Sequence, residues 1–455
     1  MENKNESVLR TVKLRAAPSL DRRKIMTKTI STRKTWFAVA TSGSGNLLEV
    51  YDFAVYAFFA TTIAKLFFPN VDETTSLLQT FAAYGAGFIA RPLGSYVIGR
   101  IGDRRGRKPA MLLTIICMAI GSIGIGLIPT YETIGVGAPI LLVVLRCLQG
   151  FAAGGEWGTS ASYIVEWSPA GRKGFFGSFQ SVSSSGGALL ASLVASALLL
   201  IPAEDLLDWG WRVPFIAGGL AIFAFSLFLR AHAEETPEYV NSKTEVVNPT
   251  ETKPYVLGLQ AFGFTIFWTT LSYLVSAYMV TYTQNHAGLT RTEALISSNI
   301  ALLLQIMLIP VAGALSDRFG RKPLLLLGCI GTATLAYPIL NMMSGGASFH
   351  QVVMLQCCLS ALFAMYSGPG PATICEIFPT RLRNTWMTVG YTLAVCCFGG
   401  FAPMISTWLI SVTKVAASPA FLLIPAAVVS ALVILKLPSS RISGFKPTAR
   451  AGASY

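Results

Sequence analysis

The sequence predicts an all-α membrane protein with twelve transmembrane helices in two six-helix repeats. Three observations predict this fold class: an apolar composition, alternating basic and acidic loops, and a motif that recurs along the chain. Hydrophobic residues make up 53% of the 455 residues and charged residues 13%, whereas soluble chains carry roughly 25% charged residues. This composition excludes a soluble fold, and it excludes a disordered chain, which requires low hydrophobicity and high charge.

Twelve apolar segments follow one another, each bounded by Gly, Pro or charge, and a helix needs about 20 residues to cross a bilayer. We expect them at residues 35–66, 77–99, 110–129, 138–167, 175–201, 212–230, 255–284, 294–315, 324–343, 351–376, 385–412 and 420–437. The predicted domains are a basic cytoplasmic tail (1–34), an N-terminal six-helix bundle (35–230), a central cytoplasmic loop (231–254), a C-terminal six-helix bundle (255–437) and a short cytoplasmic tail (438–455).

The charged residues predict how the chain is oriented. The net charge of +13 comes from 35 Lys and Arg against 22 Asp and Glu, and the basic residues gather in the first tail and in alternate loops. Basic loops stay on the cytoplasmic side, so both termini are predicted to be cytoplasmic, in the inner membrane of a bacterial cell. This distribution also argues against a nucleic-acid partner, and we expect the chain to act as a monomer.

The first tail lacks the short apolar core and small-residue cleavage site of a signal peptide, and Met26 offers an alternative start. The eight cysteines lie in or beside apolar segments and form no CxxC pair. We therefore expect small buried side chains, with no disulfide framework and no zinc site.

Two motifs recur at nearly the same offset. Residues 99–109 and 313–323 share the pattern Gly-x-x-x-Asp-Arg-x-Gly-Arg-Lys-Pro, 214 residues apart, and residues 166–169 and 376–379 share Glu-x-x-Pro, 210 residues apart. Two motifs at similar offsets indicate a duplicated six-helix unit. Such duplications are typical of secondary transporters, whose site lies between the two halves.

The repeated aspartates suggest a conformational latch. A bond from Asp103 or Asp317 to the opposite half would stabilise one access state, and breaking it would release the other. The alternative is that these loops only anchor the chain by the positive-inside effect. The predicted gating residues are Asp103, Arg104, Asp317 and Arg318 in these loops, Glu166 and Glu376 at the inner ends of the fourth and tenth segments, and Arg212 at the outer surface.

Carboxylates inside apolar segments are costly in a membrane and are functional candidates by default. Glu49 and Asp52 lie three residues apart and share one face of the first helix, and Glu156 lies in the fourth segment. A carboxylate in low dielectric could take up a proton near neutral pH, so these three are the candidates for proton coupling. Alternatively, Glu49 or Asp52 only pairs with Arg91 and fixes the packing.

Two arginines inside the segments are candidates for binding a substrate carboxylate, because the guanidinium fork matches two oxygens. Arg91 precedes Pro92 in the second segment, and Arg146 lies in the fourth. Arg146 has a stronger alternative, since it lies nearer the outer end of its segment and could extend to water.

Trp268 and Tyr366 complete the predicted substrate-binding set, although plain packing is an alternative for both. Tyr366 precedes the sequence Gly-Pro-Gly-Pro at residues 368–371, which predicts a break in the tenth helix and backbone groups exposed to a cavity.

Glycines recur every four residues in the fourth segment, at Gly150, Gly154 and Gly158. This strip predicts a close approach of another helix. Sliding along the strip during a change of access is a further possibility.

No phosphate loop, nucleotide fingerprint or metal-ligand spacing occurs outside these helices. The sequence therefore predicts that the protein is not an enzyme and uses no cofactor, with the proton gradient as the source of energy.

Taken together, the motifs resemble those of the major facilitator superfamily, and within it the metabolite–proton symporters. The resemblance rests on both Asp-Arg-x-Gly-Arg-Lys loops and on residues 45–53, 91–94, 149–156, 209–214 and 235–238. Residues 131–216 look more like α-ketoglutarate permeases and residues 364–419 like citrate–proton symporters, while proline/betaine symporters share the first half. The chain departs from the pattern at Val50, where an aromatic residue is usual.

The resemblance implies two halves that rock about a midplane cavity, and a proton symporter that takes up a small organic acid such as a di- or tricarboxylate. A proton symporter of zwitterionic osmolytes is the alternative, although the tail after Pro438 is short and has no heptads, unlike the coiled coil of osmosensing members. A non-transporting membrane sensor is the alternative from another class. Export by proton antiport also stays open, because the residues do not specify direction.

Overall fold

The computed structural model of the chain describes residues 32–69, 73–198, 201–234, 236, 254–378 and 383–437. The predictions for the first 31 residues, including Met26, for most of the central loop and for the tail after residue 437 lie outside the described residues. Within the described ranges the chain is helical and contains no strand.

Nine described helices are long and apolar enough to cross a membrane. They are α6 (Arg107–Leu127), α8 (Gly137–Glu166), α9 (Lys173–Leu198), a rod that ends in α11 (Gly219–Ala231), α13 (Pro254–Tyr273) continuing through α14 (Met279–His286), α15 (Arg291–Phe319), α16 (Arg321–Ser344), α17 (Phe349–Ser367) with α18 (Gly370–Ile377), and α20 (Thr388–Ala394) with α21 (Ala402–Thr413). Three further rods run beside them: α3 (Thr32–Phe58), α5 (Glu73–Arg104) and α22 (Ala420–Lys436). The prediction of an all-α membrane fold is confirmed.

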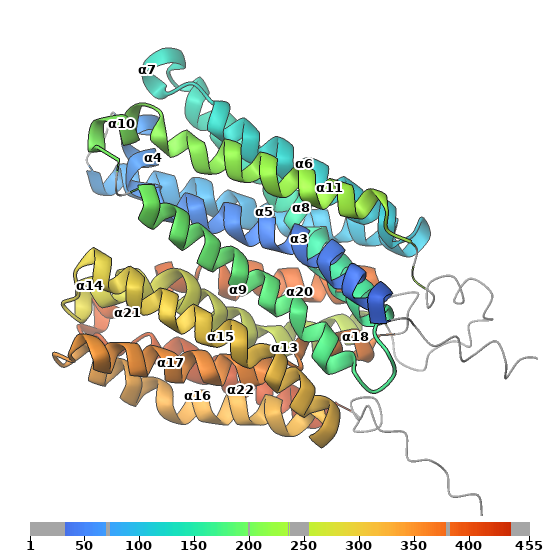
Figure 1. Cartoon of the computed structure of the whole chain (residues 1–455). Helices are drawn as coiled ribbons and strands as arrows, with labels where there is room; N and C mark the ends of the chain where they lie inside the picture. The colour runs from blue at the N-terminus through green and yellow to red at the C-terminus, as the bar shows by residue number, and fades with distance from the viewer. Residues whose placement is uncertain are drawn as a thin grey trace, which may run out of the picture.

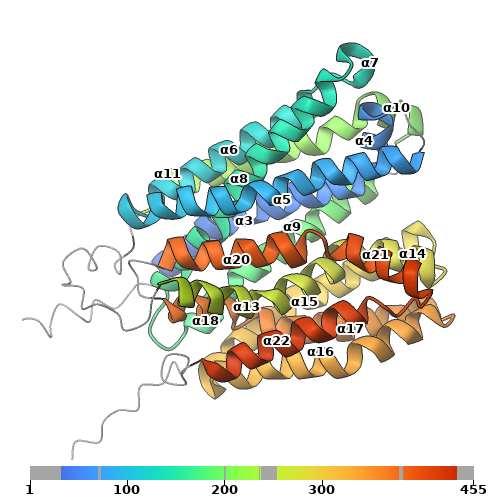
Figure 2. The same ribbon diagram turned by 180° about the vertical axis from the view of Figure 1, so that it is seen from behind.

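The rods form two bundles that lie side by side (Figures 1 and 2). One bundle contains α3, α5, α6, α8, α9 and α11, and the other contains the helices from α13 to α22. Between the bundles, α9 packs on α15 and α18, and α5 packs on α20. The interior that these three contacts enclose is where a site shared by both halves can form.

The two bundles differ from the predicted segments at the first helix. One rod was expected over residues 35–66, but α3 ends at Phe58 and the short helix α4 (Ala60–Phe67) follows. The helix α3 is polar inside, because Thr41, Ser42, Asn46 and the carboxylates Glu49 and Asp52 are buried against neighbouring helices. The break predicted in the tenth span is confirmed, since α17 ends at Ser367 and α18 begins at Gly370.

The glycine strip of α8 brings this helix against two partners. A Cβ atom at Gly150 or Gly154 would approach the carbonyl oxygens of Gly87 and Arg91 on α5 more closely than real Cβ atoms ever do. At Gly158 the nearest group is instead the hydroxyl of Thr388, from the other bundle. The strip therefore sets the contact of α8 with α5 and, at its end, with the opposite half.

We expect Gly150→Ala to destabilise the protein by about 1–3 kcal/mol, as overpacking of a tight contact does. The measurement is the melting temperature of the purified protein in detergent. Gly137→Ala on the same helix is the matched control, because the nearest side-chain atom to a Cβ there is 3.6 Å away. Equal melting temperatures for the two variants would contradict the close contact of α5 with α8.

Candidate functional site

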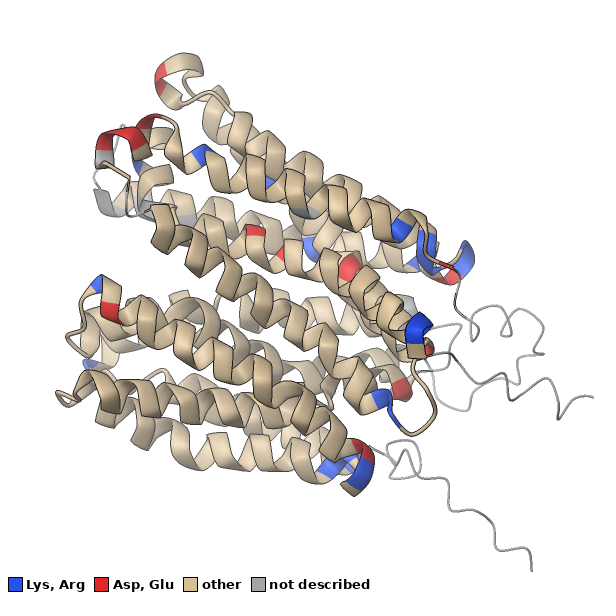
Figure 3. Ribbon diagram, in the orientation of Figure 1, with Lys and Arg blue, Asp and Glu red and all other residues tan. Residues whose placement is uncertain are grey.

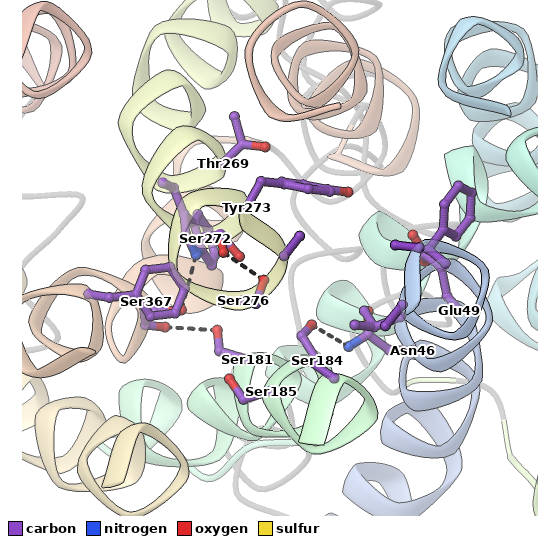
Figure 4. Close-up of a pocket in the computed structure, with 18 of the residues that line it drawn as sticks. Asn46, Glu49, Ser181, Ser184, Ser185, Thr269, Ser272, Tyr273, Ser276 and Ser367 are labelled. Carbon is purple, nitrogen blue, oxygen red and sulfur yellow. Dashed lines mark hydrogen bonds between the residues drawn. The ribbon is translucent and has the colours of Figure 1, made fainter. Parts of the chain in front are cut away.

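A cavity of about 150 Å³ lies between the two bundles. The N-terminal half lines it with Glu49, Arg91 and Trp157, and the C-terminal half with Trp268, Thr269 and Gln305. Figure 4 shows serines from both halves on its walls, among them Ser181, Ser184 and Ser272. The position between two duplicated bundles and the polar lining are those of a transporter substrate site.

The charged group of the cavity is an ion pair between α3 and α5. Arg91 Nη1 lies 3.0 Å from Glu49 Oε1, and the two residues are only 4% and 5% exposed. The rings of Phe53 and Phe88 cover the guanidinium, with centroids 4.6 Å and 4.5 Å from its central carbon. Glu49 Oε2 and Arg91 Nε have no hydrogen-bond partner among the described residues, so each group keeps bonding capacity for a ligand.

Asp52 does not take part in that pair. Its carboxylate accepts hydrogen bonds from Ser122 Oγ (2.7 Å) and Gln149 Nε2 (3.3 Å), and Gln149 Oε1 in turn accepts one from Arg146 Nη1 (2.9 Å). The partners that contact Asp52 are therefore neutral. Arg146 is connected to Asp52 only through the side chain of Gln149. Sequence analysis missed Ser122 and Gln149, although the three-residue spacing of Arg146 and Gln149 was a usable signal.

Arg146 is fully buried, with its guanidinium 3.7 Å from the ring centroid of Tyr56. The suggestion that it extends to water at the outer end of its helix is therefore wrong. The residue does not line the cavity either. Contact of Arg146 with substrate stays a prediction.

Glu156 forms an ion pair with Arg230 and accepts hydrogen bonds from Thr114 and from Ser160 Oγ (2.7 Å). Both charged residues are buried within the N-terminal bundle and do not line the cavity. Sequence analysis did not consider Arg230, the last residue of the sixth predicted segment. Proton coupling by Glu156 stays a prediction.

The predicted aromatic residues lie on one side of the cavity, and only one of them lines it. Trp268 does, and its Nε1 donates a hydrogen bond to Ser367 Oγ at 3.0 Å. Tyr366 lies behind it and donates its hydroxyl to the carbonyl of Phe264 at 2.6 Å. A stacked pair that sequence analysis missed, Trp157 and Tyr391, joins the two halves with ring centroids 3.7 Å apart.

The two repeated aspartates both bond to the opposite half. Asp103 accepts hydrogen bonds from the backbone nitrogen (2.9 Å) and the hydroxyl (2.6 Å) of Thr385. Asp317 accepts them from the backbone nitrogens of Gly174 (2.7 Å) and Phe175 (2.8 Å), at the start of α9. Phe175 and Thr385 are 210 residues apart, the offset of the second repeat, so the two contacts are related by the duplication.

Further ion pairs surround these contacts. Glu166 pairs with Arg107 at 3.1 Å and with Arg383, from the other half, at 3.0 Å, and Arg321 pairs with Glu376 at 2.8 Å. We call the bonds of Asp103, Asp317 and Glu166 to the opposite half the closing contacts.

Three predicted gating arginines lie outside the closing contacts. Arg104 and Arg318 are exposed, and their gating role stays a prediction. Other arginines of these loops are buried in the network. Those are Arg107 and Arg321, four residues after each aspartate. Arg212 bonds to the carbonyls of Gly126 and Ile128, both in its own half.

Figure 3 shows how charge is distributed along the bundles. Lys and Arg gather at the end where α3 begins and α22 ends, which we call the basic end. The short helix α10 (Ala203–Asp208) at the opposite end carries acidic residues. The closing contacts lie at the basic end.

Two helical bundles around a central polar cavity, with charged contacts between the halves at one end, are the arrangement of a secondary transporter. Family models match on either side of the central loop: "Sugar (and other) transporter" over residues 36–254 and "Major Facilitator Superfamily" over residues 256–454. The chain belongs to the Major Facilitator Superfamily.

Curated relatives cover most of the chain. A citrate-proton symporter of Klebsiella pneumoniae is 37% identical over 84% of this chain and 87% of its own length. An alpha-ketoglutarate permease of Escherichia coli K12 is 37% identical over 84% and 89%, and a proline/betaine transporter of the same strain is 31% identical over 90% and 86%. The relatives are transporters, so the predictions of family membership and of no enzymatic activity are confirmed.

Solved structures share the fold. The proton:xylose symporter XylE bound to 6-bromo-6-deoxy-D-glucose superposes with a TM-score of 0.74 at 20% identity, over 91% of this chain and 98% of that one. An inward open conformation of XylE from E. coli gives a TM-score of 0.66 at 20% identity, over 89% and 96%.

Removing the charge of Asp103 is expected to open the basic end. A hydrogen bond to a charged group contributes about 1.5–3 kcal/mol, so Asp103→Asn should raise the open population about tenfold or more. Cys375 reports opening, because it is fully buried on α18 beside the closing contacts. The measurement is its alkylation rate by mass spectrometry.

Arg104→Ala, at an exposed position of the same loop, is the matched control and should leave the rate unchanged. Cys329, buried inside the C-terminal bundle, should react equally slowly in all variants. An unchanged alkylation rate of Cys375 in Asp103→Asn would contradict the predicted role of Asp103 in closing the basic end.

Proposed function

We propose that the protein is a proton-coupled symporter that takes up a small organic acid by alternating access. The observation that carries the proposal is Arg91, a buried guanidinium with spare bonding capacity in a cavity between the two halves. Proton symporters of organic acids among the relatives support it. Both termini then lie in the cytoplasm of a bacterial cell, since the basic end carries the start of α3 and the end of α22, and the chain acts as a monomer.

The cavity supports a carboxylate substrate in a specific way. Glu49 already shows how a carboxylate fits Arg91, with one oxygen at 3.0 Å from Nη1. An entering carboxylate would compete with Glu49 for the same guanidinium. Binding would therefore change the charge balance around Glu49 and Asp52, which lie one turn apart on α3.

Asp52 is the carboxylate best suited to carry the proton. Glu49 and Glu156 each contact an arginine directly, whereas the partners that contact Asp52 are the neutral side chains of Ser122 and Gln149. A carboxylate with neutral partners loses no ion pair on protonation. Gating by the closing contacts would then alternate access to the loaded site.

The zwitterion alternative keeps one supporting observation. Arg91 and Glu49 offer a cation and an anion side by side, which could bind the two charges of a zwitterion, and proline/betaine transporters are among the relatives. Uptake into proteoliposomes of organic acids, proline and betaine, with and without an imposed pH gradient, separates the two functions. An organic-acid carrier should also ignore an osmotic upshift.

Arg91→Lys should reduce uptake of the transported acid at least tenfold, because lysine keeps the charge but loses the fork that binds two oxygens. Initial rates in proteoliposomes measure the effect. Arg100→Lys is the matched control on the same helix, since Arg100 is exposed and bonds to Tyr96. Normal uptake by Arg91→Lys would refute carboxylate binding at this position.

Asp52→Asn should abolish accumulation driven by the pH gradient while retaining exchange of internal for external substrate. Exchange needs binding and alternating access, but it needs no net proton movement. The two readouts are gradient-driven uptake and counterflow in the same proteoliposomes, with the exposed Asp208→Asn as control. Gradient-driven accumulation by Asp52→Asn would assign the proton to another carboxylate.

A further inference from the structure

The charge of the cavity limits how many carboxylates a substrate can carry. Among the described residues that line it, Arg91 is the one cation and Glu49 the one anion, so the lining is neutral. Arg146, the other buried arginine near the cavity, is fully buried behind Tyr56 and does not line it. A second carboxylate would therefore be buried without a cation, which is strongly unfavourable.

Protonation does not change this conclusion. If Asp52 takes a proton while a monocarboxylate binds Arg91, the proton offsets the charge of the ligand and the site as a whole gains no net charge. A dicarboxylate or a tricarboxylate would leave one or two negative charges without a partner even then. The cavity thus matches one carboxylate for each proton.

The C-terminal half lines the same cavity with two uncharged polar groups. Thr269 Oγ1 and Gln305 Oε1 are in residues only 3% exposed, line the cavity, and have no hydrogen-bond partner among the described residues. The amide nitrogen of Gln305 already donates a hydrogen bond to Ser185 Oγ at 2.6 Å. The amide oxygen is therefore the atom of this side chain that is left for a ligand. Figure 4 shows Thr269 and Glu49 on separate walls of the cavity.

The amide oxygen of Gln305 selects the chemistry of the ligand, because it can accept a hydrogen bond but cannot donate one. An ionised carboxylate has no proton to donate, so it cannot satisfy the amide oxygen of Gln305, whereas a hydroxyl group can. A quaternary ammonium such as betaine carries no such donor either. Buried polar groups left without a partner are rare in native proteins and usually have one in a functional state.

The duplication links the two kinds of contact. Arg91 precedes Asp103 by 12 residues, and Gln305 precedes Asp317 by the same 12 residues, so the two side chains occupy equivalent positions of the repeated unit on α5 and α15. Both line the cavity. One repeat thus presents a guanidinium and the other a neutral amide at the same place.

We propose that the substrate is a monocarboxylate that also carries hydroxyl groups, with its carboxylate at Arg91 and its hydroxyls at Gln305 and Thr269. This inference rests on the proposed organic-acid function and names its substrate class. The stacked rings of Trp157 and Tyr391, with Trp268 edge-on to both, provide an apolar wall for the carbon skeleton.

The test uses counterflow by the full-length protein in proteoliposomes with defined probes. Quinate and D-gluconate are hydroxylated monocarboxylates, cyclohexanecarboxylate lacks the hydroxyls, and citrate, 2-oxoglutarate and glycine betaine represent the other classes. We expect quinate or D-gluconate to be transported with a KM at least tenfold below that of cyclohexanecarboxylate, and citrate and 2-oxoglutarate to be excluded.

Thr269→Val removes one hydroxyl at nearly constant shape. It should raise the KM for the transported hydroxy acid about tenfold, the worth of one hydrogen bond, and leave that for cyclohexanecarboxylate unchanged. Thr332→Val is the matched control, because Thr332 also has a buried hydroxyl without a partner among the described residues but lies away from the cavity. It should change neither KM.

The outcomes distinguish the inferred substrate class from the proposed organic-acid symport. Preferred transport of citrate or 2-oxoglutarate would overturn the hydroxylated monocarboxylate and leave organic-acid symport standing. An unchanged KM in Thr269→Val would overturn the assignment of the hydroxyl contact. Transport of betaine without any acid, or no transport of any acid, would overturn both the inference and the proposed function.

Discussion

The structure depends on the requirement that a charge buried in a membrane protein must have a partner. Removing a carboxylate or a guanidinium from water costs several kcal/mol even after relaxation. Two of the ion pairs that meet this cost in the N-terminal bundle are Glu49 with Arg91 and Glu156 with Arg230. Only the first pair lines the cavity. The second pair is buried within the N-terminal bundle, away from the cavity.

The same requirement explains how one end of the bundles closes. Asp317 accepts bonds from two backbone nitrogens at the start of α9, where the unpaired N–H groups and the helix dipole favour a negative charge. Asp103 finds the equivalent nitrogen at Thr385 and adds its hydroxyl. Each aspartate therefore bonds to groups that its own half does not provide. Separation of the halves would leave four such groups to be solvated by water.

Much of the fold followed from the sequence because its signals are strong and additive. Composition, segment length and the repeat each depend on many residues at once, so a wrong interpretation of one residue does not change the predicted fold. The site was less predictable, because spacing places a residue on a helix but does not tell which neighbour that face meets. The basic loop shows this limit: Arg104 and Arg107 look alike in the motif, and only the packing of α6 decides that Arg107 is the buried partner of Glu166. Arg146 shows the same limit, since a residue near the end of an apolar segment is buried only when another helix covers it.

The two halves differ at positions that face the cavity. The duplicated positions that close the basic end retain aspartate, arginine and glutamate in both repeats. At the cavity, however, the equivalents of Glu49 and Arg91 at the same offset are Gly263 and Gln305. If the halves contributed equally to binding, two arginines would face each other, and each would need a carboxylate from the ligand or from the chain. A single guanidinium opposite a neutral amide allows a ligand with one charged end and one hydrogen-bonding end to contact both halves at once. A ligand that bonds to both halves stabilises an arrangement in which they approach each other, and this links its binding to a change of access.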